Sequence, residues 1–301
     1  MENRKTYIIA PVLVIVIMAL SLVLRHIDAS ILGEGETVFL SVAALQLVVL
    51  FLPALIYVRI RSIPIPRLRL RLPPRKSLLF ILSSLVVVIA GSMLISFGMY
   101  FCGIPTSNTL TYSELIPDRL TSRTVFVSIA FAVIPALTEE FLCHSVILEE
   151  YDTLGMGGSI IMSSLIFAIL HANLEAFPIY LFSGLVLGFV SYVSRSVFAS
   201  MAVHLVYNLY ILFFEKYISA IIKIPQNVIF VIFLTVALLL LFSFFIFAQT
   251  ESILLKNGRN ALDRDRDFER SGGKSPLIHA IMSPSFLVCV ALYLVAVIFI
   301  R

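Results

Sequence analysis

Long apolar runs recur from one end of this chain to the other. Each is about as long as the 20 residues a helix needs to cross a bilayer. We place nine of them, at 7–24, 38–58, 78–101, 124–148, 158–177, 178–194, 197–215, 227–248 and 285–300. Of the 301 residues, 60% are hydrophobic and 13% are charged, whereas a soluble chain carries about 25% charged residues. The sequence therefore predicts an all-α, polytopic helical membrane protein. It has eight to nine transmembrane helices, because only Pro178 separates the fifth run from the sixth.

The charges between the runs predict the orientation. The stretch 59–76 holds seven arginine and lysine residues and no acid, and the positive-inside rule places such a loop in the cytoplasm. Counting helices from it puts 149–157, Arg195 and 249–284 on the same side, and puts 101–123 and the C-terminus outside. We interpret 59–76 as a topology anchor that also contacts anionic lipid. The net charge of +4 therefore reports on topology, and no nucleic-acid partner is expected.

Ionisable side chains are scarce inside the runs, and such groups are costly in hydrocarbon, so those present mark a functional site. Glu139 and Glu140 lie in the fourth run, His171 in the fifth and His204 in the seventh. With His144, three of the five histidines of the chain fall in this small set. The membrane-embedded glutamates and histidines are therefore the candidate site.

Helical geometry arranges these residues. Residues four apart share one face of a helix, which pairs Glu140 with His144, Phe167 with His171, and His204 with Asn208. Glu139 points about 100° away from Glu140 around the helix, so the two carboxylates cannot share one catalytic role. Counted from the cytoplasmic helix ends, Glu139, His171 and His204 lie about 10–20 Å deep. We expect them to line one cavity that opens toward the cytoplasm, beside a helix loosened by Pro135.

These residues also carry a resemblance. Glu139-Glu140-x-x-x-His144, Phe167-x-x-x-His171 and His204-x-x-x-Asn208 resemble the three motifs of the CAAX protease and bacteriocin-processing family. That family includes the type II CAAX prenyl endopeptidases, and its motifs read Glu-Glu-x-x-x-Arg, Phe-x-x-x-His and His-x-x-x-Asn. The order and the spacing match across about 85 residues, 124–210. Outside that stretch no motif matches.

The resemblance implies an organisation and a chemistry. Residues 121–215 would form a four-helix catalytic core, flanked by transmembrane helices with a basic loop in 1–120 and with a polar loop in 216–301. The activity implied is that of an intramembrane endopeptidase without a cofactor. Glu139 would be the general base and His171 would orient the water. His204 and Asn208 would stabilise the oxyanion, with Glu140, His144 and Phe167 in support.

Several alternatives stay open. The family arginine is His144 here; a histidine can be neutral, so the pair with Glu140 can share one proton and make activity depend on pH. The same replacement could instead mark an inactive member that acts as a membrane scaffold or regulator. Glu175 either orients His171 or is a carboxylate near the helix end. One glutamate and two histidines also make a plausible zinc shell, although we favour a site without metal.

The expected partners are the lipid bilayer and a peptide or protein substrate, lipidated or membrane-associated. In a prokaryote the protein would lie in the cell membrane and process peptide precursors, whereas prenylated proteins are a eukaryotic use of this fold. A proton-coupled transporter is the remaining rival, because buried glutamate and histidine can relay protons. That reading also predicts inverted repeats, which the sequence lacks.

Overall fold

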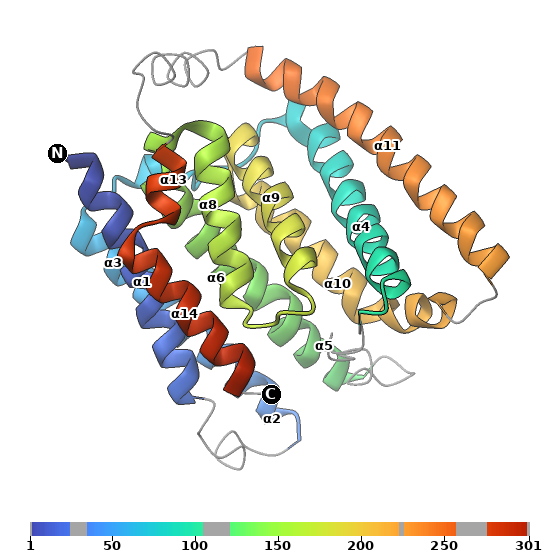
Figure 1. The fold of residues 1–301 in the computed structure, drawn as a ribbon, viewed down its shortest axis with the longest axis horizontal. Helices are drawn as coiled ribbons and strands as arrows, with labels where there is room; N and C mark the ends of the chain where they lie inside the picture. The colour runs from blue at the N-terminus through green and yellow to red at the C-terminus, as the bar shows by residue number, and fades with distance from the viewer. Residues whose placement is uncertain (1, 25–34, 105–120, 223–225, 257–275, 300–301) are drawn as a thin grey trace.

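The computed structural model describes residues 2–24, 35–104, 121–222, 226–256 and 276–299 (Figure 1). Within these ranges every regular element is a helix, which confirms the predicted all-α class. The α-helices are α1 Glu2–Leu24, α2 Thr37–Gln46, α3 Leu52–Arg61, α4 Leu78–Phe101, α5 Ser122–Ser128, α6 Ile134–Phe141, α7 Leu148–Glu150, α8 Gly155–Leu170, α9 Phe177–Ser194, α10 Val197–Ile222, α11 Gln226–Lys256, α13 Pro276–Ile281 and α14 Pro284–Phe299.

Short helices of other types connect or interrupt these elements. The π-helical segments are η2 Leu47–Phe51, η6 Ile129–Val133 and η7 Leu142–Ile147, and the 3₁₀ turns are η3 Ile65–Leu68, η4 Arg75–Ser77 and η8 Asp152–Leu154. Because η2 joins α2 to α3, and η6 and η7 join α5, α6 and α7, each set forms one long irregular helix.

The membrane-spanning segments agree with the apolar runs in the sequence. Six stretches of the described residues are long and apolar enough to cross a bilayer: Thr37–Arg61, Leu78–Phe101, Ser122–Glu150, Asp152–Leu170, Phe177–Ser194 and Val197–Phe214. Three shorter apolar helices cover Ile9–Leu24, Ile232–Ala248 and Pro284–Ile298. The chain is thus a multi-pass membrane protein. Its length-qualified spans number six in the described part, and the predicted eight to nine are not confirmed.

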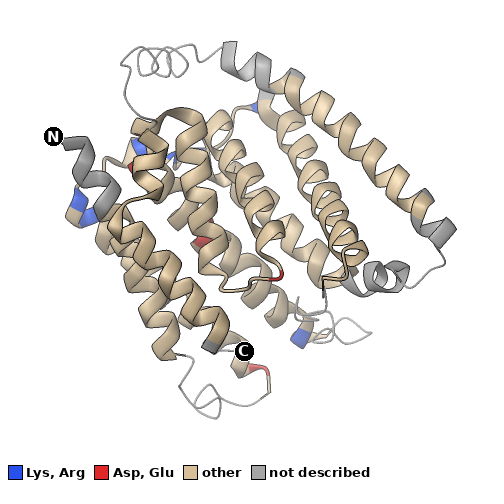
Figure 2. Cartoon of the chain, in the orientation of Figure 1, with Lys and Arg blue, Asp and Glu red and all other residues tan. Residues whose placement is uncertain are grey.

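The helices pack as a bundle around α6 and η7. Helices α8, α9 and α10 contact this central segment, α1 packs against α14 on one side, and α4 packs against α11 on the other. In Figure 2 charged positions lie mostly near the helix ends, whereas an acidic stretch sits in the middle of the bundle on α6. The fold therefore surrounds the acidic pair of α6 with other helices.

The helix that carries this pair is irregular where Pro135 enters it. Pro135 follows the π-helical η6 and has no N–H with which to continue the ladder. The carbonyl of Ala130, five residues earlier, accepts a hydrogen bond from Gln46 Nε2 of α2 at 3.2 Å. A neighbouring helix thus satisfies a carbonyl exposed by the irregularity, as expected for a proline inside a membrane helix.

Candidate active site

The described structure brings the predicted site residues together from three separate parts of the chain. Glu139 and Glu140 lie on α6 and His144 lies on η7. Phe167 is in the last turn of α8, with His171 at the C-cap of that helix. His204 and Asn208 lie one turn apart on α10. Helix packing, rather than proximity in sequence, therefore creates the site.

Glu140 is fully buried and binds two histidines. One carboxylate oxygen, Oε2, lies 3.0 Å from His144 Nδ1, and the other, Oε1, lies 2.9 Å from His204 Nδ1. Glu140 and His144 are 0% exposed and His204 is 4% exposed. A carboxylate accepts hydrogen bonds, so each imidazole donates through Nδ1. The expected contact between Glu140 and His144 is present, and a bond to His204 is added to it.

His144 occupies the position where the family pattern has arginine. Its Nε2 atom is buried and has no hydrogen-bond partner among the described residues. A neutral imidazole that donates through Nδ1 leaves Nε2 as a bare acceptor, whereas an imidazolium would bury an unpaired N–H. Gly188 of α9 gives the ring its space, since a Cβ there would lie 3.2 Å from His144 Cδ2. The surroundings therefore suit a neutral histidine.

Glu139 lies in a different setting from its neighbour. Its Oε2 atom is 3.6 Å from His171 Nε2 and 3.9 Å from His204 Nε2. Both distances exceed those of a hydrogen bond, and Oε2 has no such partner among the described residues. The side chain keeps 19% of its surface exposed. Glu139 is therefore a carboxylate that faces two imidazoles at ion-pair distance, without a hydrogen bond to either.

A hydrogen bond at Nδ1 orients each of these two imidazoles. His171 Nδ1 lies 2.7 Å from the carbonyl of Phe167, and because a carbonyl can only accept, Nδ1 carries the proton. His204 Nδ1 donates in the same way to Glu140. In the neutral form of each ring, Nε2 then holds the lone pair. The two Nε2 atoms and Glu139 Oε2 consequently converge on one small region.

Aromatic rings hold the histidines in place. The Phe167 ring packs against three of them, with centroid distances of 4.6 Å to His171, 5.5 Å to His144 and 5.7 Å to His204. On the other side of His171, Tyr180 of α9 stacks at 3.8 Å with an interplanar angle of 24°. Sequence reasoning did not single out Tyr180, because it belongs to none of the motifs.

The end of α8 differs from the prediction. The fifth run was expected to continue to residue 177, but α8 ends at Leu170. Ala172 has a positive φ of 47°, and the Asn173 side chain accepts a hydrogen bond from the Ala176 N–H at 3.0 Å. Pro178 sits in the first turn of α9, where proline is tolerated, so it marks a helix start. The sequence suggested Glu175 as one residue that could orient His171. In the structure, the carbonyl of Phe167 accepts a hydrogen bond from His171 Nδ1.

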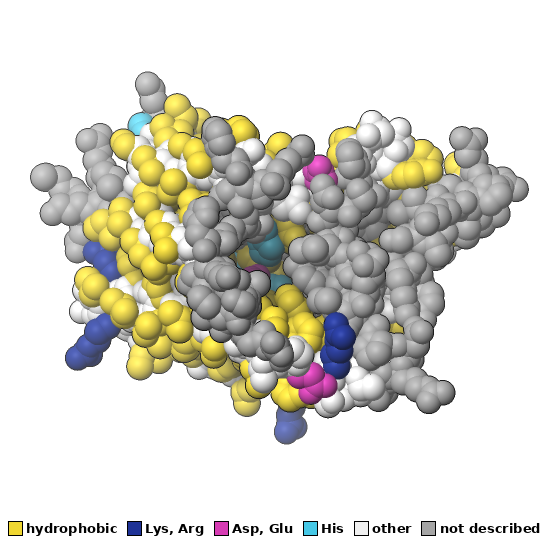
Figure 3. All heavy atoms as spheres, turned by 90° about the horizontal axis from the view of Figure 1, so that it is seen from below, with side chains coloured by type: hydrophobic (Ala, Val, Ile, Leu, Met, Phe, Trp, Pro, Cys, Tyr) yellow, Lys and Arg dark blue, Asp and Glu magenta, His cyan; other side chains and the backbone are white. Residues whose placement is uncertain are grey.

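The site is visible from one end of the bundle. Figure 3 looks at the end that lies at the bottom of Figure 1, where α2 and α5 begin, and histidine and acidic side chains are seen there at the floor of a hollow. The side chains of His171 and Glu139 are 20% and 19% exposed. The basic stretch 59–76 lies at the opposite end. The predicted opening of the site toward the cytoplasm stays a prediction.

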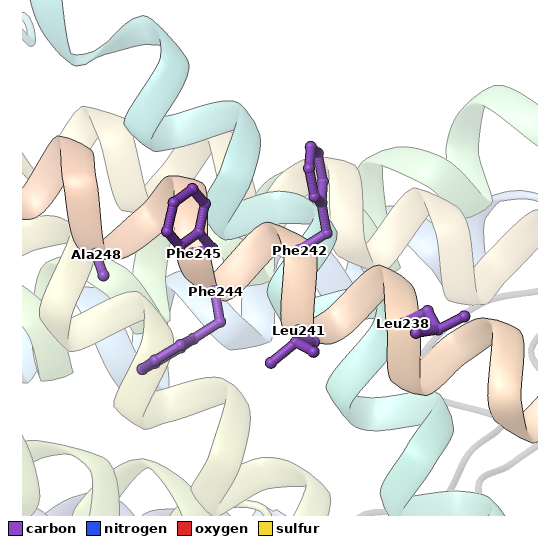
Figure 4. A pocket seen from close by; sticks show the side chains of 6 residues that line it. All are labelled: Leu238, Leu241, Phe242, Phe244, Phe245 and Ala248. Carbon is purple, nitrogen blue, oxygen red and sulfur yellow. The ribbon is translucent and has the colours of Figure 1, made fainter.

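A second hollow on the surface has a different character. Figure 4 shows it along α11, and it contains only apolar side chains. They are Leu238, Leu241, Phe242, Phe244, Phe245 and Ala248. A surface of this kind on a membrane-spanning helix suits acyl chains of lipid and offers no group for chemistry.

The zinc alternative stays open. Among the described residues, no group of three or more histidine, cysteine, aspartate or glutamate side chains is arranged to hold a metal ion. The Oε2 atom of Glu139 lies 3.6 and 3.9 Å from the Nε2 atoms of His171 and His204.

Fold and site together define a class: a multi-pass helical membrane protein with a glutamate and histidine site inside the bundle. Residues 121–210 match the family model described as type II CAAX prenyl endopeptidase Rce1-like, and this match confirms the resemblance inferred from the three motifs. Members of that family are peptidases. No curated protein and no solved structure gives a significant match to the chain.

Proposed function

We propose that this protein is an intramembrane endopeptidase that hydrolyses peptide bonds with a water molecule activated by Glu139. The observation that carries the proposal is that Glu139 Oε2 lies near the Nε2 atoms of two oriented histidines and has no hydrogen-bond partner among the described residues. A general base needs an unengaged carboxylate within reach of a water molecule. Glu139 meets that need, whereas Glu140 is fully engaged.

The proposed reaction begins with the water. Glu139 takes a proton from it while His171, fixed through Nδ1, orients it by accepting at Nε2. The oxygen attacks the scissile carbonyl carbon, and the carbonyl oxygen becomes an oxyanion. The proton held by Glu139 then passes to the leaving amine as the C–N bond breaks. Every proton and bond in the hydrolysis is accounted for without a cofactor.

His204 and Asn208 serve the oxyanion in this scheme. The two residues lie one turn apart on α10, and His204 Nδ1 is held by Glu140 at 2.9 Å. In the cationic form of His204, Nε2 is also a hydrogen-bond donor. Donors fixed in advance at the site of developing charge are a large contribution to catalysis in a site sheltered from water. Glu140 therefore acts through His204, with His144 supporting Glu140.

The substrate class follows from the surroundings of the site. Glu139 lies on a segment that spans the membrane, Ser122–Glu150, so a substrate must be a peptide or a protein that is itself associated with the membrane, whether by lipidation or by an apolar segment. The bilayer is the second partner.

The test compares purified wild-type protein with the variant Glu139→Gln in detergent, using a broad panel of peptides and reading cleavage by mass spectrometry. Glu175→Gln is the matched control, because it makes the same substitution in the connection between α8 and α9 at a residue that has no part in the proposed reaction. Cleavage by wild type and control but not by Glu139→Gln supports the proposal. Equal cleavage by Glu139→Gln, or none by wild type, contradicts it and leaves the scaffold reading. A chelator that abolishes wild-type cleavage would support the metal alternative.

A further inference from the structure

A hydrogen bond from a neighbouring helix fixes the backbone of His144. The Ser191 side chain of α9 donates through Oγ to the carbonyl oxygen of His144 at 2.7 Å. Both residues are 0% exposed, and 47 positions separate them in the sequence. In the low-dielectric interior such a bond is stronger than it would be in water. Ser191 therefore joins α9 to the residue that donates to Glu140.

This bond is unusual for a serine inside a helix. Serine hydroxyls in helices ordinarily donate to a carbonyl three or four residues earlier in the same helix. Ser84 of α4 and Ser164 of α8, both 0% exposed, do so at 2.8 and 2.6 Å, each to the carbonyl four residues before it. The hydroxyl of Ser191 is directed across the helix interface instead, so it serves the neighbouring element.

The local helix type explains why the carbonyl of His144 accepts this bond. His144 lies in the π-helical segment η7, a kind of element that occurs frequently at functional sites. In a regular α-helix the N–H of Leu148 would donate to the carbonyl of His144. Here the Leu148 N–H is directed to the carbonyls of Cys143 and Ser145. The π-helical turn thus releases the carbonyl from its usual α-helical donor, and Ser191 supplies another.

Helix α9 also contacts the ring of His144. Gly188 lies three residues before Ser191, on the same face of α9. A Cβ atom on Gly188 would lie 3.2 Å from His144 Cδ2 and 3.5 Å from His144 Nε2, so the absence of a side chain there lets the helix approach closely. Helix α9 therefore contacts His144 at both its ring and its backbone.

The short side chain of histidine makes the backbone position important. Two side-chain torsions set the position of Nδ1, and each has few preferred values, so a displaced backbone carries the ring with it. The bond of 3.0 Å from His144 Nδ1 to Glu140 Oε2 therefore depends on where the backbone of His144 is held. Glu140 in turn accepts the bond of 2.9 Å from His204 Nδ1.

From these contacts we propose that Ser191 is a positioning residue of the active site. It holds the backbone of His144 so that the imidazole donates to Glu140, and through Glu140 it keeps His204 oriented. Ser191 contacts no reacting atom in the proposed reaction. As far as it concerns catalysis, the inference rests on the proposed peptidase function. The hydrogen bond between His144 and Glu140 can be measured without any cleavage.

Nuclear magnetic resonance of the histidines tests the proposal directly. Purified full-length protein with ¹⁵N-labelled histidine is studied in detergent, and the Nδ1–H signal of His144 is assigned by its absence from His144→Gln. In the wild type this proton should lie downfield and exchange slowly with water. Ser191→Ala should move it upfield and raise its exchange rate about tenfold, because the donor is no longer held against Glu140. Ser84→Ala, which removes a buried hydroxyl of α4, is the matched control and should leave the signal unchanged.

A second variant keeps the test decisive if Ser191→Ala does not fold. Ser191→Cys is close in size and retains a weak S–H donor, so its signal should move in the same direction by a smaller amount. A His144 signal that neither variant of Ser191 moves overturns the proposal. A signal that Ser84→Ala moves equally, or a wild type without a slowly exchanging proton on His144, also overturns it.

Cleavage kinetics separate the role of Ser191 from the proposed function. With a peptide that the purified protein cleaves, Ser191→Ala should lower kcat about 3- to 10-fold and leave KM unchanged, as expected when an interaction of the transition state is weakened. Ser191→Cys should recover part of kcat, and Ser84→Ala should match the wild type. An unchanged kcat, or a raised KM alone, overturns the positioning role and leaves the peptidase standing. If the wild type cleaves no peptide, the peptidase fails and the histidine spectra alone decide the role of Ser191.

Discussion

Two adjacent glutamates of one helix have opposite surroundings in this protein. Glu140 is 0% exposed and both of its oxygens bind imidazoles at 2.9 and 3.0 Å. Glu139 keeps 19% of its side chain exposed, and its Oε2 lies 3.6 Å or more from the histidines it faces. The comparison teaches that the two neighbours have separate roles. The hydrogen-bonded carboxylate of Glu140 organises the site, and the carboxylate of Glu139, which has no hydrogen bond at Oε2, is available for chemistry.

The division has a simple geometric origin. Consecutive residues of a helix point about 100° apart, so a pair of glutamates must face different surroundings. Glu140 points between η7 and α10, where two imidazoles meet it. Glu139 points toward His171 at the end of α8. The predictions that follow test whether the two roles can be separated.

The largest effect is expected from Glu139→Gln. An amide cannot accept the proton of the attacking water, so the rate of peptide cleavage should fall by about 10²–10⁴-fold. The free energy of unfolding should change by less than about 0.5 kcal/mol, because no buried hydrogen bond is lost. Single-turnover cleavage and denaturant unfolding in detergent measure the two quantities. A variant that unfolds readily would show that Glu139 is structural.

Glu140→Gln should act mainly on stability. The amide keeps the shape of the side chain but turns one acceptor into a donor, which then faces an imidazole N–H of His144 or His204. Disrupting a buried and fully paired carboxylate of this kind costs about 3–5 kcal/mol. The loss should appear as a lower unfolding midpoint in detergent. An unchanged midpoint would contradict the role given to Glu140.

His144→Phe should have a smaller effect. Phenylalanine retains the ring beside Phe167 and Gly188 but removes the N–H that Glu140 accepts, at a cost of about 1–3 kcal/mol. His144→Gln retains a donor and should recover part of this loss. Equal losses in the two variants would mean that ring packing, rather than the hydrogen bond, is what His144 contributes.

Substitution of Tyr180 should have the smallest effect on cleavage, and it tests how His171 is held beside Glu139. Tyr180→Ala removes the ring stacked on His171 and should lower kcat about 3- to 10-fold, in keeping with the energy of an aromatic pair. Tyr180→Phe keeps the ring and should retain nearly full kcat. If both variants lose activity equally, the hydroxyl rather than the stacking is the functional feature.

Much of this arrangement could be predicted from the sequence. Apolar runs placed the helices, because spacing and hydropathy are local properties of the chain. The pair of Glu140 and His144 followed from helical spacing. The grouping of Glu139, His171 and His204 was predicted from buried charge together with the family motifs. In the structure, the Nε2 atoms of both histidines lie within 3.9 Å of Glu139 Oε2.

Other features depend on tertiary packing and could not be predicted. Glu140 and His204 are 64 residues apart, and no periodicity relates them. The stacking of Tyr180 on His171 depends on how α9 lies against α8. The sequence also predicted that the fifth run continues to residue 177, because a turn made of Ala172, Asn173 and Ala176 contains no strong helix breaker.

The most direct test of the division of roles measures both properties in both glutamate variants. Peptide cleavage and the free energy of unfolding are determined for Glu139→Gln and Glu140→Gln under one set of detergent conditions. We predict a crossed result, in which Glu139→Gln loses cleavage with its stability intact and Glu140→Gln loses stability by several kcal/mol. Two variants that lose the same property to the same extent would contradict the account.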